Sequence, residues 1–411
     1  MAPIDNISPA VPPGIQPVSP WNWLRTNLFS TWYNVIITIV CLVLIAQGLL
    51  GFIRWAFGAA QWAVIGANLQ LFIVGRFPPQ LYWRVWLSLM IISSLAGLSW
   101  GVYQRHAQHW NRTVLVVLGA VVLATILLPL GLTPRLWMVG TIVITIASVW
   151  VGRQFLNPNL SRWLPWAWGL AFFIVLWLIK GGLGLEPTST NVLTGLVLTL
   201  LVAIISIILS FPLGVVLALG RQSDLPVVRW CSIFYIEVIR GLPLIGILFL
   251  AQVMLPLFFP PEYRQIEIFG MELFDRVLRA IAGLVLFSAA YLAENVRGGL
   301  QAVPRGQTEA AKALGLSAPL LILLIVLPQA LKAVIPAIVG QFIGLFKDTS
   351  LLALFGLLEL TGIARSVLAQ PQFLGRYAEV YLFIGLIYWI VCYGMSLASR
   401  RLEQQLNIGQ H

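Results

Sequence analysis

The chain has 411 residues, of which 59% are hydrophobic and only 9% are charged, and its formal net charge is +11 at pH 7. Soluble domains usually carry about 25% charged residues, so this composition excludes a water-soluble globular fold. Several apolar runs reach the roughly 20 residues that cross a bilayer as a helix. These runs are continuous and not alternating, which excludes a transmembrane barrel and predicts an all-α integral membrane protein.

The first half of the chain is predicted to be a short tail followed by a membrane-embedded extension. Residues 1–30 begin with a proline-rich stretch that has neither the basic nor the apolar region of a signal peptide, so they are predicted to form a disordered tail. Residues 31–187 are rich in tryptophan, which prefers the headgroup level of a membrane. Residues 58–84 contain Pro78 and Pro79 and are predicted to be an interfacial or re-entrant piece. The predicted spans lie near residues 33–57, 85–104, 114–132, 136–152 and 164–180.

The second half is predicted to be a core of five spans. A linker rich in glycine, proline and threonine, residues 180–191, separates it from the extension. We assign residues 188–402 to this core and residues 403–411 to a C-terminal tail. With the extension included, the chain is predicted to cross the membrane about 8–10 times. The core spans lie near residues 192–220, 238–258, 278–300, 328–346 and 379–399.

The basic residues orient this core in the membrane. They gather after the first, third and fifth core spans, which the positive-inside rule places in the cytoplasm. The opposite connections carry three arginines, so the bias is partial. Because basic residues stand singly between apolar spans, their charge indicates contact with lipid and not with nucleic acid. The residues that set the orientation are Arg221, Arg229, Arg297, Arg305, Lys312, Arg400 and Arg401.

One of these cytoplasmic connections, residues 303–320, has the polar sequence VPRGQTEAAKALGLSAPL. Thr308 is predicted to cap or begin a helix whose body, EAAKAL, consists of strong helix formers. Gly315 suits the left-handed position that ends this helix, and Ser317 is predicted to cap a second one. Helices this short are not stable alone in water and must dock against something. On local physics alone, an amphipathic connector lying on lipid headgroups explains the loop equally well.

The spacing within this loop resembles the signature of a transporter family, the permease subunits of ATP-binding cassette (ABC) importers. The matching positions are Glu309-Ala310-Ala311, then after three residues Gly315, after nine more Ile325, and after one more Leu327-Pro328. In that family the short helix inserts in a groove on the ATP-hydrolysing subunit. The resemblance implies that this loop couples the chain to such a subunit. The residues that would take part in coupling are Glu309, Ala310, Ala311, Lys312 and Gly315.

Further stretches are similar to the membrane subunits of polar amino-acid importers. They are AYLAENVRGGLQAVPRGQTEAAKALG (290–315), EVIRGLPLIGILF (237–249) and LFKDTSLLALFGLLEL (345–360). The resemblance covers residues 190–405 and implies the five-helix core of a type I ABC importer. The N-terminal half looks like that of the general L-amino-acid permeases, which carry extra spans. Leu242 departs from the family pattern, which usually has threonine there, so any role of that hydroxyl is absent.

The resemblance also implies partners and a location. The partners are an ABC ATPase dimer that binds ATP and Mg, a second permease core and an extracytoplasmic amino-acid-binding protein. The second core is expected to be a related, shorter subunit, with a copy of this chain as the alternative. The location is the bacterial cytoplasmic (inner) membrane, and the substrate is an amino acid. The chain contains no Gly-Lys dipeptide, which a Walker A loop requires. We therefore expect no catalytic, cofactor or metal site in this chain.

Two ionisable residues are predicted to lie deep in the fourth core span. A helix that enters near residue 328 rises about 28 Å before it reaches Lys347, at 1.5 Å per residue. Ionisable residues at such depth pair with one another or line a cavity. Lys347 and Asp348 are therefore candidates for the substrate pathway, and a Lys347–Asp348 ion pair that only braces the bundle is the alternative.

The same segment offers further pathway candidates. Asp348, Thr349 and Ser350 are predicted to cap a second short helix, residues 351–360, and helix ends of this kind hold substrates in other transporters. Gln341 lies about one and a half turns before Lys347 and is a candidate of unknown orientation.

Other charged residues are predicted to gate or brace the bundle near its cytoplasmic end. Glu237 and Arg240 stand one helical turn apart, which predicts an i,i+3 ion pair. The full set of gate or bracing candidates is Glu237, Arg240, Glu294, Asn295 and Arg297.

Two other classes of membrane protein are alternatives to an importer permease. An ion-coupled secondary amino-acid transporter requires paired halves and mid-span acids for the coupling ion, and neither is evident in the sequence. A membrane enzyme requires a convergent His/Asp or Ser/Lys set, which the chain does not offer. Neither class explains the loop around Glu309.

Overall fold

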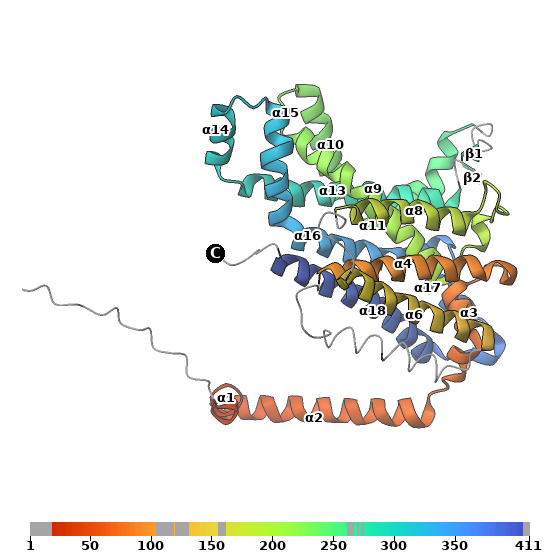
Figure 1. Ribbon diagram of the computed structural model, residues 1–411. Coiled ribbons are helices and arrows are strands. Elements are labelled where there is room, and N and C mark those ends of the chain that lie inside the picture. Colours follow the sequence, from red (N-terminus) through yellow and green to blue (C-terminus); the bar gives the residue numbers. More distant parts are fainter. Residues whose placement is uncertain are drawn as a thin grey trace, which may run out of the picture. The chain divides into compact units, whose positions relative to one another are not determined.

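The computed structural model describes residues 19–103, 119, 131–154, 162–260, 267–268, 271–272 and 275–405 (Figure 1). The chain divides into two compact units, Met1–Gln61 and Trp62–His411. Within the described residues, the strands are a short hairpin in which β1 (Glu267–Ile268) pairs antiparallel with β2 (Met271–Glu272). The ordered elements are otherwise helices, so the predicted all-α class is confirmed.

The first unit consists of α1 (Pro20–Asn27), α2 (Trp32–Arg54) and the π-helical turn η1 (Trp55–Ala59). The helix α1 corrects the predicted disordered tail over residues 20–27. Pro20 stands in its first turn, where the fixed φ of proline favours a helix and its missing N–H leaves no bond unmade. The helix α2 is apolar, has no buried residue and corresponds to the predicted first span.

The extension continues in the second unit with elements of very different length. At 1.5 Å per residue, α3 is about 18 Å long, too short to cross a bilayer, as predicted for the piece that contains Pro78. The longer helices α4, α6 and α8 occupy three predicted spans, whereas the predicted span 114–132 lies almost entirely outside the described residues. The elements are α3 (Ala63–Val74), the 3-10 turn η2 (Pro79–Leu81), α4 (Tyr82–Tyr103), α6 (Leu132–Gln154) and α8 (Leu164–Lys180).

Helices α4 and α6 pack backbone to backbone. A Cβ atom built on Gly101 would lie 2.3 Å from the carbonyl oxygen of Val149, and one built on Gly152 would lie 2.6 Å from that of Leu98. No side chain fits at such distances, so both positions require glycine. Close approach through small residues is the usual basis of helix association in lipid, where apolar burial gives no advantage over the acyl chains.

The core begins after the linker and contains the four predicted spans at 192–220, 278–300, 328–346 and 379–399. They correspond to α9, α13, α16 and α18, and α18 extends to residue 405, into the predicted C-terminal tail 403–411. The elements in chain order are η3 (Thr190–Val192), α9 (Gly195–Arg221), α10 (Pro226–Gly241), α11 (Leu244–Phe249), η4 (Leu250–Met254), η5 (Leu255–Phe258), α13 (Arg276–Ala302), α14 (Arg305–Ala313), α15 (Ala318–Leu321), η6 (Ile322–Val326), α16 (Leu327–Asp348), η7 (Thr349–Phe355), α17 (Leu360–Leu368), η8 (Pro371–Phe373) and α18 (Tyr377–Gln405).

Helix α13 is the centre of the core and packs against α9, α16 and α10. Two glycines bring its neighbours close. A Cβ atom on Gly214 of α9 would lie 2.7 Å from the Cβ of Leu292, and one on Gly299 of α13 would lie 2.4 Å from the carbonyl oxygen of Ala330. The start of α13 and α14 lie at opposite ends of the bundle (Figure 1).

The predicted span at 238–258 is broken by a sharp bend near its start. Helix α10 and the segment Leu244–Phe258 meet at an angle of 105°. The bend falls at Leu242, whose φ and ψ of −99° and 142° are extended. The ring of Pro243 clashes with a helical conformation of the preceding residue, so the chain turns here and begins a new helix.

Helix α16 is also longer than predicted at its start. The elements α15 and η6 lead directly into it and make one helical segment of 38 residues, Ala318–Phe355. Its length of about 57 Å exceeds the roughly 30 Å of a bilayer core, so its first turns extend beyond the hydrocarbon. Pro328 has no backbone N–H and cannot donate a hydrogen bond to the preceding turn. The π-helical turn η6 ends at Val326, two residues before it, and helices often become irregular near a proline.

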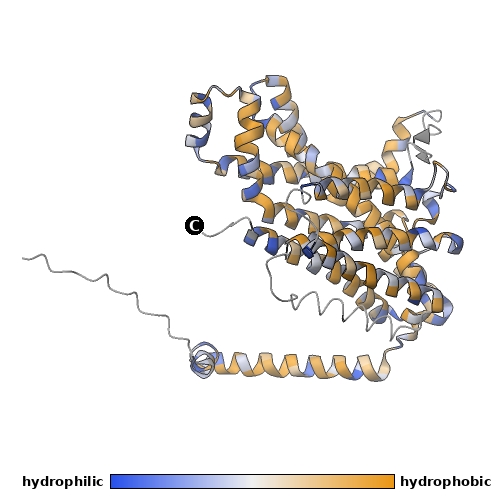
Figure 2. Ribbon diagram, in the orientation of Figure 1, coloured by the Kyte–Doolittle hydropathy of each residue, from blue (hydrophilic) through white to orange (hydrophobic). Residues whose placement is uncertain are grey.

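Seven helical segments in the described part of the chain are long and apolar enough to cross a membrane, and the bent pair makes an eighth if it is one span. The predicted span 114–132 is not part of this count, because nearly all of it lies outside the described residues. Hydrophobic residues cover these helices, whereas hydrophilic residues gather on α14 and at helix ends (Figure 2). The chain is a multi-pass membrane protein.

Candidate functional site

The short helix α14 presents its polar residues to solvent. Ala311 is the buried residue of this helix, with 4% of its surface exposed, and the helix packs against α15 and η6. Glu309, Ala310 and Lys312 are exposed, and Leu314 directly after the helix is 81% exposed. An exposed helix with a protruding leucine has the form of a segment that inserts into a groove on another protein.

The ends of α14 agree only in part with the sequence. Gly315 has a φ of +75° and ends the helix in the predicted left-handed conformation. The helix begins at Arg305 after Pro304, so Thr308 lies inside it and the predicted cap at Thr308 is wrong. Pro304 cannot continue the preceding α13, which moves the break, and therefore the new helix, toward the N-terminus. Ser317 occupies the N-cap position of α15 as predicted, although its side chain makes no capping bond.

Five charged residues from three helices meet at the end of the core that bears α14, and we name them the charged cluster. Its central residue is Glu294, which contacts three arginines. Glu294 Oε1 accepts hydrogen bonds from Arg297, at 2.9 Å from Nε and a shorter distance from Nη2. Glu294 Oε2 lies 3.6 Å from Arg221 Nη1 and 3.5 Å from Arg240 Nη1. The members are Arg221 of α9, Glu237 and Arg240 of α10, and Glu294 and Arg297 of α13.

Glu237 and Arg240 each pair with a residue of another helix, so the predicted ion pair between them is wrong. Glu237 Oε1 accepts a hydrogen bond from Arg221 Nη1 at 2.8 Å, and Arg240 lies over the ring of Tyr291 at 5.7 Å. A neighbouring helix supplies a better-placed partner for each residue than its own helix does. Asn295 is partly buried and makes no hydrogen bond to the cluster within the described residues. Four predicted gate residues therefore come together, joined by Arg221.

Lys347 and Asp348 do not form the predicted ion pair, since no nitrogen–oxygen contact within 4.0 Å joins them. Successive residues on a helix point about 100° apart, which directs the two side chains to different faces. Lys347 is exposed, and Asp348 is partly buried. The direct ion pair is therefore not formed in this structure, and contact of Asp348 with a substrate remains a prediction.

The predicted helix 351–360 is also wrong. Thr349–Phe355 is a 3-10 helix, and Gly356 ends it in the left-handed conformation with a φ of +73°. The next α-helix is α17, which begins only at Leu360. Asp348 makes no side-chain capping bond, because helical geometry continues through this residue and leaves no free N–H groups for it to accept from.

The other pathway candidates lie in different surroundings. Thr349 is fully buried, and its hydroxyl donates to the carbonyl oxygen of Phe346 at 2.6 Å. Gln341 is partly buried and donates from Nε2 to Ser288 Oγ at 3.4 Å across to α13. Ser350 is partly buried. Of these residues, Gln341 and Ser350 keep partial access to open space.

A buried carboxylate that the sequence did not single out anchors the segment after η7. Glu359 is fully buried and caps α17 by accepting hydrogen bonds from the backbone of Thr361 at 2.8 Å and Gly362 at 2.9 Å. The hydroxyl of Tyr388 on α18 donates to the same carboxylate at 3.1 Å. The available signal was an acidic residue directly before an apolar helix, a common N-cap arrangement.

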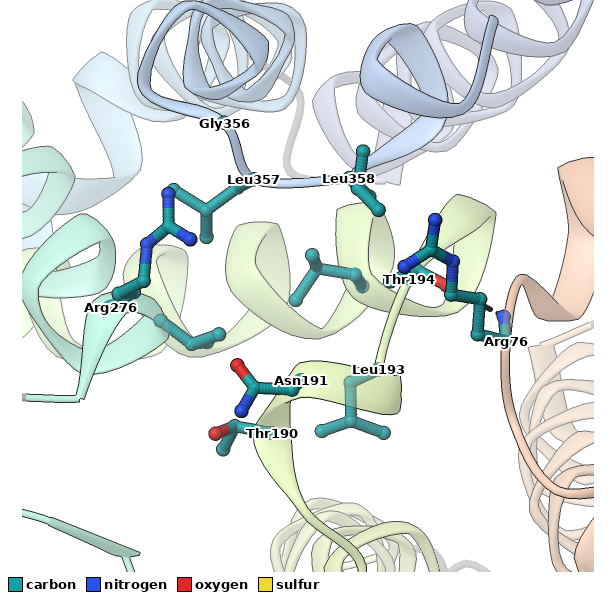
Figure 3. A pocket seen from close by; sticks show the side chains of 11 residues that line it. Arg76, Thr190, Asn191, Leu193, Thr194, Arg276, Gly356, Leu357 and Leu358 are labelled. Atoms are coloured by element: carbon teal, nitrogen blue, oxygen red, sulfur yellow. Dashed lines mark hydrogen bonds between the residues drawn. The ribbon is translucent and has the colours of Figure 1, made fainter. Parts of the chain in front are cut away.

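At the end of the core opposite α14, an open pocket of about 190 Å³ lies between the extension and the core (Figure 3). We name it the arginine pocket, because Arg76 and Arg276 line it from opposite sides. Its apolar lining comes from Leu193, Leu198, Val277 and Leu357, and Thr190 and Asn191 add polar groups.

Close backbone contacts hold the arginine pocket together. A Cβ atom on Gly75 would lie 1.9 Å from Thr194 Oγ1, so only glycine fits there. The same hydroxyl oxygen accepts a hydrogen bond of 2.7 Å from the backbone N–H of Arg76. The backbone N–H of Gly195 donates to the carbonyl oxygen of Leu358 at 2.7 Å. The turn that carries Arg76 and the segment that follows η7 are thus both fixed to the start of α9.

Sequence reasoning did not predict the arginine pocket. Arg76 lies 200 residues before Arg276 in the sequence. The two line one pocket because α3 packs against α9. The only local signal was Gly75 before Arg76, which marks a turn without indicating its neighbour. Within the described residues, no group of three or more His, Cys, Asp or Glu side chains is placed to hold a metal ion.

Comparison with known proteins identifies relatives over almost the whole chain. The chain is 37% identical over 390 residues to the inner membrane amino-acid ABC transporter permease protein YhdY of Escherichia coli, covering 94% of this chain and 93% of that protein. It is 34% identical to the glutamate/glutamine/aspartate/asparagine transport system permease protein BztC of Rhodobacter capsulatus, covering 96% and 95%.

A shorter relative matches about half of the chain. The probable glutamine ABC transporter permease protein GlnP of Bacillus subtilis is 40% identical over 209 residues, which are 51% of this chain and 90% of that protein. A family profile described as "Binding-protein-dependent transport system inner membrane component" matches residues 210–408. The chain therefore belongs to the family of inner membrane components of binding-protein-dependent transport systems.

Proposed function

We propose that the chain is the membrane-spanning permease subunit of an ATP-driven amino-acid importer in the bacterial cytoplasmic membrane. It would form part of the translocation pathway and have no ATPase site of its own. A separate ATPase dimer, a second permease core and an extracytoplasmic amino-acid-binding protein would complete the assembly. ATP and Mg would be bound by the ATPase subunits.

The observation that carries this proposal is the exposed helix α14 between α13 and α16. It displays Glu309, Lys312 and Leu314 to solvent on the side that the basic residues assign to the cytoplasm. In the described part of the chain, α14 packs on α15 and η6, which continue into α16. A force on α14 would therefore reach a core span directly. The relatives named as amino-acid ABC transporter permeases support the substrate class.

The test is reconstitution of the purified chain in vesicles with and without its co-expressed ATPase subunits and binding protein. We expect ATP hydrolysis that rises when amino acid and binding protein are added together, and uptake only when ATP is present. Uphill accumulation of amino acid by this chain alone, without nucleotide, would contradict the proposal and favour ion coupling.

A further inference from the structure

The two arginines of the arginine pocket form no ion pair with any described residue. The guanidinium of Arg76 makes no ion pair or hydrogen bond within the described residues, and Arg276 makes one hydrogen bond, from Nη2 to the carbonyl oxygen of Phe355 at 2.5 Å. A guanidinium has five N–H donors. Most donors on both side chains are therefore free to bind a ligand.

The nearby acidic side chain is already engaged. Asp275 Oδ1 accepts a hydrogen bond from the backbone N–H of Val277 at 2.7 Å, and its Oδ2 accepts one from the hydroxyl of Thr190. It caps the start of α13 and forms no ion pair with Arg276. These hydrogen bonds occupy Asp275 without removing its charge. Among the described residues that line the pocket, two are arginines and none is a carboxylate.

The shape and lining of the pocket narrow the chemistry of a ligand. Arg276 and Arg76 stand at opposite sides of the cavity, and Leu357 lies beside Arg276 (Figure 3). Guanidinium groups bind carboxylates through paired hydrogen bonds. An anion with a carboxylate at each end offers one such group to each guanidinium, and a hydrocarbon chain between them suits the leucine lining. Asn191 and Thr190 offer oxygen atoms that can accept bonds from an ammonium group.

We propose that the arginine pocket binds a dicarboxylic amino acid, with one carboxylate on Arg76 and the other on Arg276. This inference rests on the proposed function and names a substrate class for it. The positive-inside orientation places the pocket on the extracytoplasmic side, where an amino acid is delivered. The extension supplies Arg76, so it contributes directly to recognition instead of only adding spans.

The test is protection of the two arginines from phenylglyoxal, which modifies free guanidinium groups, in the intact complex held in neutral-lipid nanodiscs without binding protein. Modification of each arginine is followed by peptide mass spectrometry. We expect L-glutamate to slow modification of Arg76 and Arg276, and L-glutamine, with one carboxylate, to protect more weakly. Arg365 of α17, which is exposed and does not line the pocket, is the internal control and should react at an unchanged rate.

Substitution makes the test specific to the paired arginines. In the Arg76→Gln variant, the concentration of L-glutamate that half-protects Arg276 should rise about tenfold, the loss expected for one charge-assisted hydrogen-bonded pair. The Arg365→Gln variant should leave this concentration unchanged. Arg76→Lys keeps the charge without the paired geometry and should give an intermediate value.

Several results would overturn the inference. Equal protection by inorganic phosphate and L-glutamate would indicate a general anion or lipid-phosphate site. Protection that requires the binding protein, and that its amino-acid-free form also provides, would indicate a docking contact. No protection by L-glutamate would show that the pocket is not a site for it. Each of these results leaves the proposed function standing if binding protein and amino acid still stimulate ATP hydrolysis, whereas loss of that stimulation in the unmodified complex would contradict the proposed function itself.

Discussion

Two groups of acidic residues in this protein differ in their bonding. Some are buried and bonded within the chain, and others have no ion pair among its described residues; the second group bears on function. Glu359 is fully buried and fully hydrogen-bonded, so it serves the architecture. Glu309 is exposed on α14, and Asp348 is partly buried without an ion pair. Polar groups that the chain itself does not satisfy are the natural contacts for a partner or a substrate.

At Glu309, charge reversal should uncouple the protein without unfolding it. Because this side chain is exposed, Glu309→Lys should leave the melting temperature within error, yet weaken binding of the ATPase subunits by about tenfold or more, as expected for a central interface residue. The measurement is co-purification together with ATP-dependent uptake. The control is Gln307→Lys, which adds a charge two residues earlier and therefore on another face of α14. Normal ATPase binding and uptake in Glu309→Lys would refute the coupling role.

At Asp348, removal of the charge should affect transport more than stability. Asp348→Asn keeps the size of the side chain, so the fold should persist, while a substrate that pairs with this carboxylate would lose about tenfold in affinity or more. Uptake KM and the melting temperature should be measured together. The neighbouring Lys347→Gln should be measured beside it, to show whether the second pathway candidate, which points to a different face, has the same effect. An unchanged KM with a lowered melting temperature would show that Asp348 has only a structural role.

At the scale of elements, hydropathy predicts where helices lie better than where they bend. Four core spans were placed correctly because long apolar runs have few alternatives in lipid. The bend at Leu242 was missed, although Pro243 carried the signal for it. The start of α14 was displaced because Pro304 outweighs the capping preference of Thr308. The charged cluster and the arginine pocket could not be predicted from the sequence. Both depend on which helices pack against one another, and apolar periodicity does not determine that.

The packing of α4 on α6 makes a direct prediction for an element pair. Gly101→Ala places a methyl group where only 2.3 Å separates it from the carbonyl oxygen of Val149, so the helices must separate. The free energy of unfolding should fall by about 1–3 kcal/mol, the usual cost of overpacking, and the melting temperature of the purified protein should drop. Gly169→Ala on α8 meets no atom within 4 Å and should be neutral or slightly stabilising. Equal melting temperatures for the two variants would mean that α4 and α6 do not touch in the membrane.

At the scale of the whole molecule, the two ends of the core carry different chemistry. Helix α14 lies at one end of the bundle and the start of α13 at the other (Figure 1). The charged cluster belongs to the first end, and the arginine pocket, lined by Arg276 and Val277 at the start of α13, belongs to the second. Helices α9 and α13 contribute residues to both, so each connects a ligand-accessible end to the end that bears α14. A change in the packing of these helices would alter the positions of residues at both sites. Coupling between the two sites requires such a shared change.

The charged cluster should therefore control how tightly ATP hydrolysis follows transport. Glu294→Gln removes the carboxylate shared by Arg221, Arg240 and Arg297 and leaves three like charges facing one another. We expect α9, α10 and α13 to loosen at this end, so that more ATP is hydrolysed for each amino acid taken up.

Glu237→Gln is the matched control, because Glu237 pairs with Arg221 alone and its side chain is 52% exposed against 23% for Glu294. Exposed single pairs contribute little, so this variant should keep nearly the original ratio of ATP hydrolysed to amino acid transported. The two substitutions alter charge equally, but the carboxylate of Glu294 is less exposed and contacts arginines on three helices, whereas that of Glu237 contacts one arginine. If both variants shifted the ratio by the same factor, net charge at this end, and not the connection between helices, would determine coupling.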